Sequence, residues 1–237
     1  MTPSLFLCRI NITNYTIAMK IFLDCSDIDL IKQSYSTGLI DGVTTNPSLM
    51  LKNGHQPKEV LKEISSIFPF HSSISAEVVG ETEDEMLNMA EDYINIGPNI
   101  TIKVPCTRTG LRVCKKLTDD EIPVNVTLVF SANQAILSSK AGATYVSPFI
   151  GRLNDQYWDG ISLVEEISDV FTTHGSKTQV LAASIREPIQ VAKCFRVGAD
   201  ICTLPWDIFN KMYDHCLTDA GMQKFDSDWI KLQQELK

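Results

Sequence analysis

The sequence lacks any long apolar run, and no stretch of its 237 residues approaches the ~20 apolar residues that a membrane helix needs. Basic residues are also scarce, because 21 Lys and Arg stand against 29 Asp and Glu and give a net charge of −8. Such a chain is repelled by phosphate backbones over most of its surface. We therefore expect neither a membrane nor a nucleic acid as a partner, and an anionic ligand would have to be held by a few well-placed cations.

Metal-binding and disulfide motifs are missing as well. The seven cysteines are scattered without a CxxC pair, and the four histidines show no HxxH or HExxH spacing. We predict no metal site, and we interpret the cysteines as free thiols of a cytoplasmic protein.

Linker and low-complexity segments are not found, and the chain has only 12 glycines and 10 prolines beside 44% hydrophobic residues. This composition indicates a globular protein with a full core. The apolar residues 5–8 are followed at once by Arg9, which is too short a run for the core of a signal peptide. We expect residues 1–18 to be a poorly ordered extension and residues 19–237 to form one domain.

From residue 20 onward, short runs typical of β-strands alternate with stretches of helical periodicity. This alternation predicts parallel βαβ units, and eight of them favour a closed (β/α)₈ TIM barrel over the alternative, a doubly wound open sheet. An additional C-terminal helix is expected over 222–237. The predicted strands are 20–24, 42–45, 73–79, 99–105, 123–128, 144–148, 179–183 and 200–204, and the predicted helices are 27–36, 56–68, 82–95, 109–118, 131–140, 158–173, 187–197 and 206–216.

Lys103 lies in the middle of a predicted strand whose other residues are mostly apolar. Side chains at i and i+2 of a strand face the same side, so Lys103 faces away from Ile102 and Val104. An edge strand with an outward lysine would explain it, but Ile100, Ile102 and Val104 form one apolar face that should meet the helices. The lysine is then expected to point into the barrel.

Polar side chains also occur near the ends of the other strands. Each alone has an ordinary explanation as a turn or cap residue, but together they surround the predicted position of the lysine. In TIM barrels, catalytic groups come from several strands and lie at their C-terminal ends. The residues are Asp24, Asn46, Glu77, Asn125, Thr127, Ser147 and Ser184.

A lysine in such a lumen has a definite chemistry. Burial disfavours its charged form, and the free amine attacks carbonyl groups to give a Schiff base, which serves as an electron sink for cleavage of an adjacent C–C bond. Asp24 and Glu77 could transfer the protons. Arg152 and Arg186, just after the sixth and seventh strands, carry planar guanidinium groups suited to a phosphate, although two solvated surface arginines would look the same in the sequence.

Several of these segments resemble the transaldolase family, and the compact length is similar to its small, fructose-6-phosphate aldolase-like branch. The segments are Thr44-Thr45-Asn46-Pro47-Ser48, Ile102-Lys103-Val104-Pro105 with Thr107 and Gly110-Leu111, Ser147 to Arg152, and Ala182 to Arg186. The resemblance runs from about Met19 to the C-terminus.

The resemblance implies a role for each residue. Lys103 would form the Schiff base, Asp24 would act as general acid and base, and Glu77 and Thr127 would hold and activate water. No metal or organic cofactor is implied, and the partners would be sugar phosphates. Asn46, Asn125 and Ser147 would bind the dihydroxyacetone portion, and Arg152, Ser184 and Arg186 would bind the phosphate. Phe149 and Trp158 would be apolar walls of the site, although the sequence fits a position of Trp158 in the core equally well.

Two positions distinguish transfer from simple cleavage within this branch. Aldolases that act on free dihydroxyacetone tend to carry Gln in place of Glu77 and Tyr in place of Phe149. We therefore expect a transaldolase of the pentose phosphate pathway, which moves dihydroxyacetone from fructose 6-phosphate or sedoheptulose 7-phosphate to an aldose phosphate. The alternatives are a fructose-6-phosphate aldolase, a catalytically silent sugar-phosphate-binding barrel, and a phosphosugar isomerase that does not need the lysine.

The C-terminal helix is not needed to complete a barrel. In the small branch such helices pack on neighbouring subunits, so the resemblance implies a homo-oligomer, a pentamer or decamer.

Overall fold

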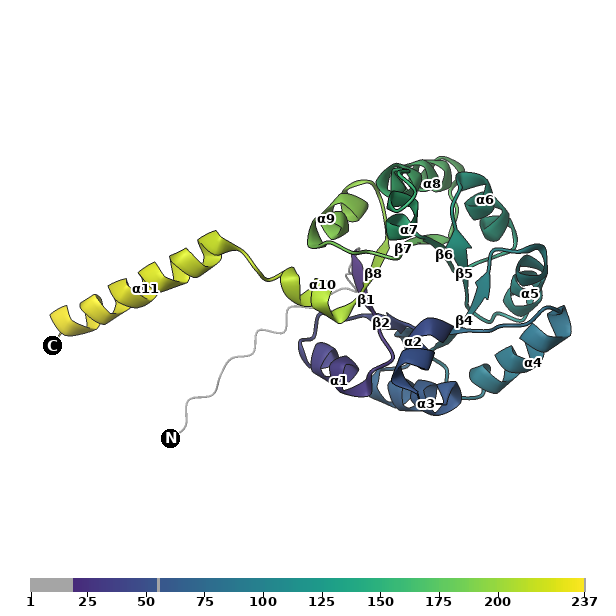
Figure 1. Cartoon of the computed structure of the whole chain (residues 1–237), viewed down its shortest axis with the longest axis horizontal. Coiled ribbons are helices and arrows are strands. Elements are labelled where there is room, and N and C mark those ends of the chain that lie inside the picture. Colours follow the sequence, from purple (N-terminus) through teal and green to yellow (C-terminus); the bar gives the residue numbers. More distant parts are fainter. Residues whose placement is uncertain (1–18, 55, 237) are drawn as a thin grey trace, which may run out of the picture.

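The computed structural model describes residues 19–54 and 56–236, and the predicted extension 1–18 lies outside them. Its eight parallel strands close into a barrel in chain order, because β1 (Lys20–Asp24) pairs with both β2 (Gly42–Thr44) and β8 (Ile201–Leu204) (Figure 1). Closure confirms the predicted (β/α)₈ barrel and rules out the open doubly wound sheet.

Helices connect the strands and surround the barrel (Figure 1). The other strands are β3 (Ser73–Glu77), β4 (Ile100–Pro105), β5 (Val124–Val129), β6 (Tyr145–Pro148) and β7 (Gln179–Ala182). The helices are α1 (Ile28–Ser36), α2 (Pro47–Asn53), α3 (Pro57–Ile67), α4 (Glu83–Ile94), α5 (Arg108–Asp119), α6 (Ala132–Lys140), α7 (Ile150–Asn154), α8 (Gly160–His174), α9 (Pro188–Arg196), α10 (Trp206–Lys211) and α11 (Cys216–Glu235).

The predicted bounds were wrong at the C-terminus. The helix expected over 206–216 ends at Lys211, and the last helix begins at Cys216 instead of residue 222. A side-chain cap explains the new start, because His215 Nδ1 accepts a hydrogen bond from the backbone N–H of Leu217. The short helices α2 and α7 were also not predicted, because neither is long enough to show a helical period.

The two faces of the strands form two different environments. Ile100, Ile102 and Val104 are buried in the main hydrophobic core with residues of the surrounding helices. A second, smaller apolar cluster of Phe22, Tyr145, Leu181, Ala183 and Ile201 comes from the opposite face of β1, β6, β7 and β8 and from the end of β7. Phe22 and Tyr145 of this cluster line the N-terminal end of the barrel, and Ala183 reaches the C-terminal end, where polar side chains lie.

Helix α11 extends away from the barrel (Figure 1). None of its 20 residues is buried, and large apolar side chains including Phe225 and Trp229 are exposed along it. None of the helices in the described part of the chain is long and apolar enough to cross a membrane.

Candidate active site

A small cavity of about 120 Å³ lies at the C-terminal ends of the strands. Active sites of TIM barrels lie at this end. Eight of the eleven predicted site residues line the cavity, and three residues that were not predicted join them. The lining residues are Asp24, Asn46, Lys103, Thr127, Ser147, Phe149, Arg152 and Ser184, with Thr44, Ala183 and Thr203 in addition.

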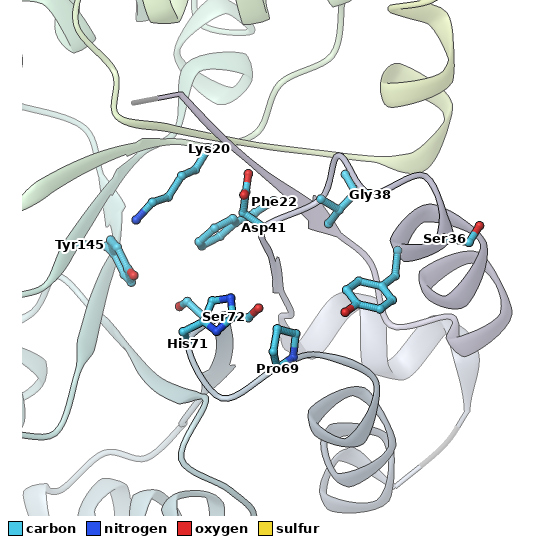
Figure 2. Close-up of a pocket in the computed structure, with 12 residues that line it drawn as sticks. Lys20, Phe22, Ser36, Gly38, Asp41, Pro69, His71, Ser72 and Tyr145 are labelled. Atoms are coloured by element: carbon cyan, nitrogen blue, oxygen red, sulfur yellow. The ribbon is translucent and has the colours of Figure 1, made fainter. Parts of the chain in front are cut away.

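A larger hollow of about 690 Å³ lies at the other end of the barrel (Figure 2). Its lining includes residues at strand starts, such as Lys20 of β1, Ser73 of β3 and Tyr145 of β6. None of the predicted site residues lines it. The smaller cavity is therefore the candidate active site in spite of its size.

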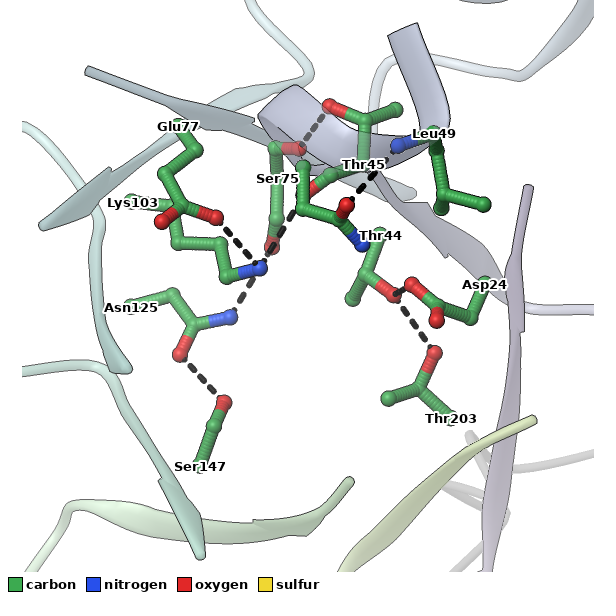
Figure 3. Close-up of polar contacts among 11 residues, drawn as sticks. Asp24, Thr44, Thr45, Leu49, Ser75, Glu77, Lys103, Asn125, Ser147 and Thr203 are labelled. Atoms are coloured by element: carbon green, nitrogen blue, oxygen red, sulfur yellow. Dashed lines mark hydrogen bonds and ion pairs between the residues drawn. The ribbon is translucent and has the colours of Figure 1, made fainter. Parts of the chain in front are cut away.

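Lys103 is buried at the centre of the site and is held by two oxygen atoms (Figure 3). Its Nζ lies 2.9 Å from Glu77 Oε2 and donates a hydrogen bond of 3.0 Å to the backbone carbonyl of Thr45. The side chains of Lys103 and Glu77 are only 5% and 14% exposed. Register explains the pairing, because Glu77 and Lys103 are opposite each other on β3 and β4. A lysine is rarely buried unless it is paired in this way.

A chain of neutral polar groups continues from Lys103 around the barrel. Asn125, opposite Lys103 on β5, donates from Nδ2 to Ser75 Oγ at 3.1 Å. Ser147 Oγ donates to Asn125 Oδ1 at 2.6 Å (Figure 3). All three side chains are buried. These bonds orient the Asn125 amide, and Asn125 belongs to the site through Ser147 although it does not line the cavity.

Asn46 lies between β2 and α2, two residues after the strand ends. Its Oδ1 accepts a hydrogen bond of 3.0 Å from the backbone N–H of Leu49 and so caps α2, whose first residue is Pro47. The cap leaves the amide nitrogen of Asn46 available to a ligand in the cavity.

Asp24 ends β1 and receives a hydrogen bond of 2.8 Å from the hydroxyl of Thr44. Burial raises the pKa of the Asp24 carboxyl above its usual value, although the positive charge of Lys103 and the Thr44 hydrogen bond act in the opposite direction. A carboxylate with a raised pKa is suited to accept and return a proton near neutral pH.

Thr127 is one of two buried side chains whose hydroxyl has no hydrogen-bond partner in the described part of the chain, and it lines the cavity. The next residue, Leu128, has a positive φ of 59°, and the pairing of β5 with β6 shifts register between Val126 and Val129. Such bulges occur next to active sites, where they redirect side chains. The Thr127 hydroxyl is therefore available to a substrate or a water molecule.

Arg152 and Ser184 line one side of the cavity. The guanidinium carbon of Arg152 lies 5.0 Å from the centre of the Phe149 ring, a cation–π contact that holds this arginine beside the apolar wall. Ser184 has a left-handed φ of 59°, which a residue other than glycine rarely adopts, and such strain concentrates at functional sites. Both positions fit an anion bound at this side of the cavity.

Arg186 does not line the cavity. Its guanidinium group binds both carboxylate oxygens of Asp155, with an Nη2–Oδ2 distance of 2.6 Å, and the arginine side chain is 51% exposed. Its Nε is nevertheless near a residue of the cavity wall, because a Cβ added to Gly151 would lie 2.8 Å from Arg186 Nε and 3.0 Å from Ser184 Oγ. Gly151 therefore leaves the space in which these two groups come close to each other.

Trp158 is neither a wall of the cavity nor a core residue. It is 66% exposed and lies in a separate surface groove with Phe130 and Leu163. The residue before it, Tyr157, has a positive φ of 62°.

Thr203 is a site residue that the sequence did not indicate. It is buried on β8, and its Oγ1 lies 2.7 Å from the hydroxyl of Thr44. The alternation of side chains along the strand 200–204 would have placed Thr203 on the lumen side. A threonine in a strand is too common, however, to indicate a site residue by itself. Within residues 19–54 and 56–236, no group of three or more His, Cys, Asp or Glu side chains is arranged to hold a metal ion.

Comparison with known proteins shows the family of the chain. The model of the family described as "Transaldolase/Fructose-6-phosphate aldolase" matches residues 21–236. The chain belongs to this family. A protein of Methanococcus maripaludis (strain C6) named "Probable transaldolase" is 48% identical over 211 residues, which cover 89% of this chain and 97% of that protein. A "Probable transaldolase" of Cereibacter sphaeroides (strain ATCC 17025) is 48% identical over 218 residues, or 92% and 99% of the two chains.

The match confirms the family resemblance of the sequence motifs. The chain is an enzyme of an aldolase and transaldolase family that acts on sugar phosphates.

Proposed function

We propose that the protein is a transaldolase that transfers a dihydroxyacetone unit through a Schiff base on Lys103. The donor would be fructose 6-phosphate or sedoheptulose 7-phosphate, and the acceptor would be glyceraldehyde 3-phosphate or erythrose 4-phosphate, as in the pentose phosphate pathway. The observation that carries the proposal is the buried amine of Lys103 at the wall of a polar cavity, 2.9 Å from Glu77 Oε2.

The reaction begins at Lys103. Its unprotonated amine attacks the ketose carbonyl, and loss of water gives the iminium ion. Asp24 then takes the proton of the hydroxyl on the carbon beyond the bond to be broken, the C–C electrons move into the iminium, and an aldose phosphate leaves. The enamine that remains attacks the carbonyl of the second aldose phosphate, which recovers the proton from Asp24. Hydrolysis of the new iminium releases the product and regenerates the amine.

Glu77 and Thr127 suit the steps that involve water. The Glu77 carboxylate can take a proton from Lys103 because the two groups are in contact. The hydroxyl of Thr127, which has no hydrogen-bond partner among the described residues, can bind the water that is released and later consumed. Asn46, Asn125 and Ser147 are the amide and hydroxyl groups that would bind the dihydroxyacetone hydroxyls.

The lining of the cavity supports this placement of the substrate. Asn46 and Ser147 lie in it together with Lys103, and Arg152 and Ser184 lie in it as well. The phosphate end of the sugar would then extend toward Arg152, Ser184 and Arg186, where planar guanidinium groups bind phosphate oxygens in pairs.

The test is borohydride reduction in the presence of fructose 6-phosphate, followed by peptide mapping. We expect a mass increment on Lys103 in the wild type and none in Lys103→Met. A folded wild-type protein without the adduct would support a silent barrel, and full activity in Lys103→Ala would support an isomerase.

Assays with and without an aldose phosphate acceptor distinguish a transaldolase from an aldolase. With fructose 6-phosphate alone, we expect little free dihydroxyacetone, and erythrose 4-phosphate should start turnover with ping-pong kinetics. The physical reason is that Phe149 has no hydroxyl to protonate the enamine. Steady release of dihydroxyacetone without an acceptor would show an aldolase instead.

We also propose that α11 packs on a second copy of the chain, in a pentamer or decamer. Most helical stability in proteins comes from the packing of an apolar face, and α11 exposes an apolar side (Met222, Phe225, Trp229 and Leu232) that another surface must cover. Light scattering should give an oligomeric mass for the full chain and a smaller mass for Phe225→Glu/Trp229→Glu. Gln223→Glu, on the other side of α11, is the matched control and should keep the oligomer. A monomeric full chain would refute the proposal.

The cytoplasm is the proposed location. The six described cysteines are free thiols, and Cys25, Cys114, Cys194 and Cys202 are buried, as expected in a reducing compartment.

A further inference from the structure

Two threonine hydroxyls form a chain that ends on the Asp24 carboxylate (Figure 3). Thr203 Oγ1 on β8 lies 2.7 Å from Thr44 Oγ1 on β2, and Thr44 Oγ1 lies 2.8 Å from Asp24 Oδ1 on β1. Both threonines are buried, at 3% and 2% exposure. They come from the two strands that flank β1 on either side where the barrel closes.

The chemistry of the three groups sets the direction of this chain. An ionised carboxylate only accepts hydrogen bonds, so Thr44 must donate its single proton to Asp24. Thr44 can then only accept from Thr203, which must be the donor. The opposite direction would leave the Thr203 proton without an acceptor, because Thr44 is its only hydrogen-bond partner in the described part of the chain.

We infer that Thr203 and Thr44 form a one-way hydroxyl relay that positions Asp24 and keeps it in the proton-accepting form. The relay binds Oδ1 and leaves Oδ2, which has no hydrogen bond within the described residues, to face the cavity and take the proton. This inference rests on the proposed role of Asp24 as general base. Thr203 acts only through Thr44 and is therefore a positioning residue.

The relay and the burial of Asp24 shift the pKa of its carboxyl in opposite directions. Burial and the negative charge of Glu77 both raise the pKa of Asp24, and the thiol of Cys25 is the next titratable group along the chain. The positive charge of Lys103 and the Thr44 hydrogen bond lower it. In the proposed cycle the iminium at Lys103 keeps this positive charge while Asp24 takes the proton, so the charge and the relay act together at that step.

The experiment compares Thr44→Val, Thr203→Val, the double variant and Thr203→Ser. Valine keeps the shape of threonine and removes the hydroxyl, whereas serine keeps the hydroxyl. The matched control is Thr101→Val, because Thr101 belongs to another buried hydroxyl pair, 2.8 Å from Ser73 Oγ, with no carboxylate attached. The first readout is the titration of the Asp24 carboxyl carbon by NMR in the unliganded protein, assigned with Asp24→Asn. The second is the acidic limb of the pH profile of kcat/KM.

Thr44→Val should move the Asp24 titration to higher pH by about one unit, a tenfold change in proton affinity, because a hydrogen bond to the charged form is lost. Thr203→Val should move the Asp24 titration in the same direction by a smaller amount. This variant removes only the hydrogen bond from Thr203 to Thr44, which strengthens the next hydrogen bond in the chain, from Thr44 to Asp24. The double variant should match Thr44→Val, and Thr203→Ser and Thr101→Val should titrate like the wild type. The acidic limb of kcat/KM should follow the NMR titration.

Two results would overturn the relay. One is an unchanged Asp24 titration in folded Thr44→Val. The other is an effect of Thr203→Val that persists in the Thr44→Val background, because Thr203 would then act independently. Failure of the proposed function is seen separately, as a wild type that forms no borohydride adduct on Lys103, and the substrate-free titration still tests the relay in that case.

Discussion

The buried ion pair between Lys103 and Glu77 predicts an unusual order of stability among its variants. Replacing Glu77 by Leu leaves a buried ammonium whose remaining acceptor is the carbonyl of Thr45. Removing one partner of a buried pair costs about 3–5 kcal/mol. Lys103→Met should cost less, about 1–3 kcal/mol, because the Glu77 side chain is 14% exposed and can be hydrated. The double variant Glu77→Leu/Lys103→Met leaves no unpaired charge and should be close to the wild type in stability, although inactive.

Urea denaturation at one fixed protein concentration measures these differences, with an unchanged m-value as the check that the same transition is compared. For a chain of this size, 1 kcal/mol corresponds to about 2–4 °C, so Glu77→Leu should lower Tm by about 6–20 °C. Lys58→Ala is the control, because Lys58 and Asp92 form a pair whose side chains are 49% and 64% exposed, and its loss should have no measurable effect. A double variant as unstable as the sum of its single variants would refute the reasoning.

Three further predictions concern single positions. Asp24→Asn should abolish transfer and stabilise the protein at pH 8, because the folded pKa of Asp24 is raised and its charge destabilises the fold above that pKa. The gain, measured by thermal unfolding, should decline as the pH falls below the folded pKa and vanish once the pH is also below the ordinary value of 3.8. A gain that grows toward low pH would contradict this sign. Gly151→Ala should raise KM for a phosphorylated donor at least tenfold, because the new Cβ would lie 2.2 Å from the backbone oxygen of Ser184; unchanged kinetics would show that the backbone moves freely. Asp155→Asn frees the Arg186 guanidinium, so inorganic phosphate should inhibit more strongly, whereas weaker inhibition would mean that Asp155 only orients the arginine.

Much of the barrel, and eight of the eleven residues predicted for the site, could be placed from local patterns. The alternation of strands and helices is a property of short segments, and it was sufficient for the closed barrel. Parity along one strand placed Lys103 opposite to Ile102 and Val104, and the structure has the lysine at the cavity and the two apolar residues in the outer core. These predictions succeeded because side-chain direction in a strand depends only on the period of two.

Contacts between distant segments decided the rest. Thr203 and Thr44 are 159 residues apart and meet only because β8 closes on β1. The sequence showed Arg186 as a cation after the seventh strand, and the fold brought it to Asp155, which holds its guanidinium outside the cavity. Trp158 was expected as a wall or a core residue, but it lies exposed in a separate surface groove.

The sequence by itself thus determined the barrel, the direction of Lys103 and the kinds of polar group around it, because hydrophobic periodicity acts over a few residues. Tertiary structure alone decided which hydroxyls reach Asp24, how small the cavity is, and that α11 extends from the barrel with its apolar side exposed. These features depend on strand register and barrel closure, which join residues that no local pattern relates.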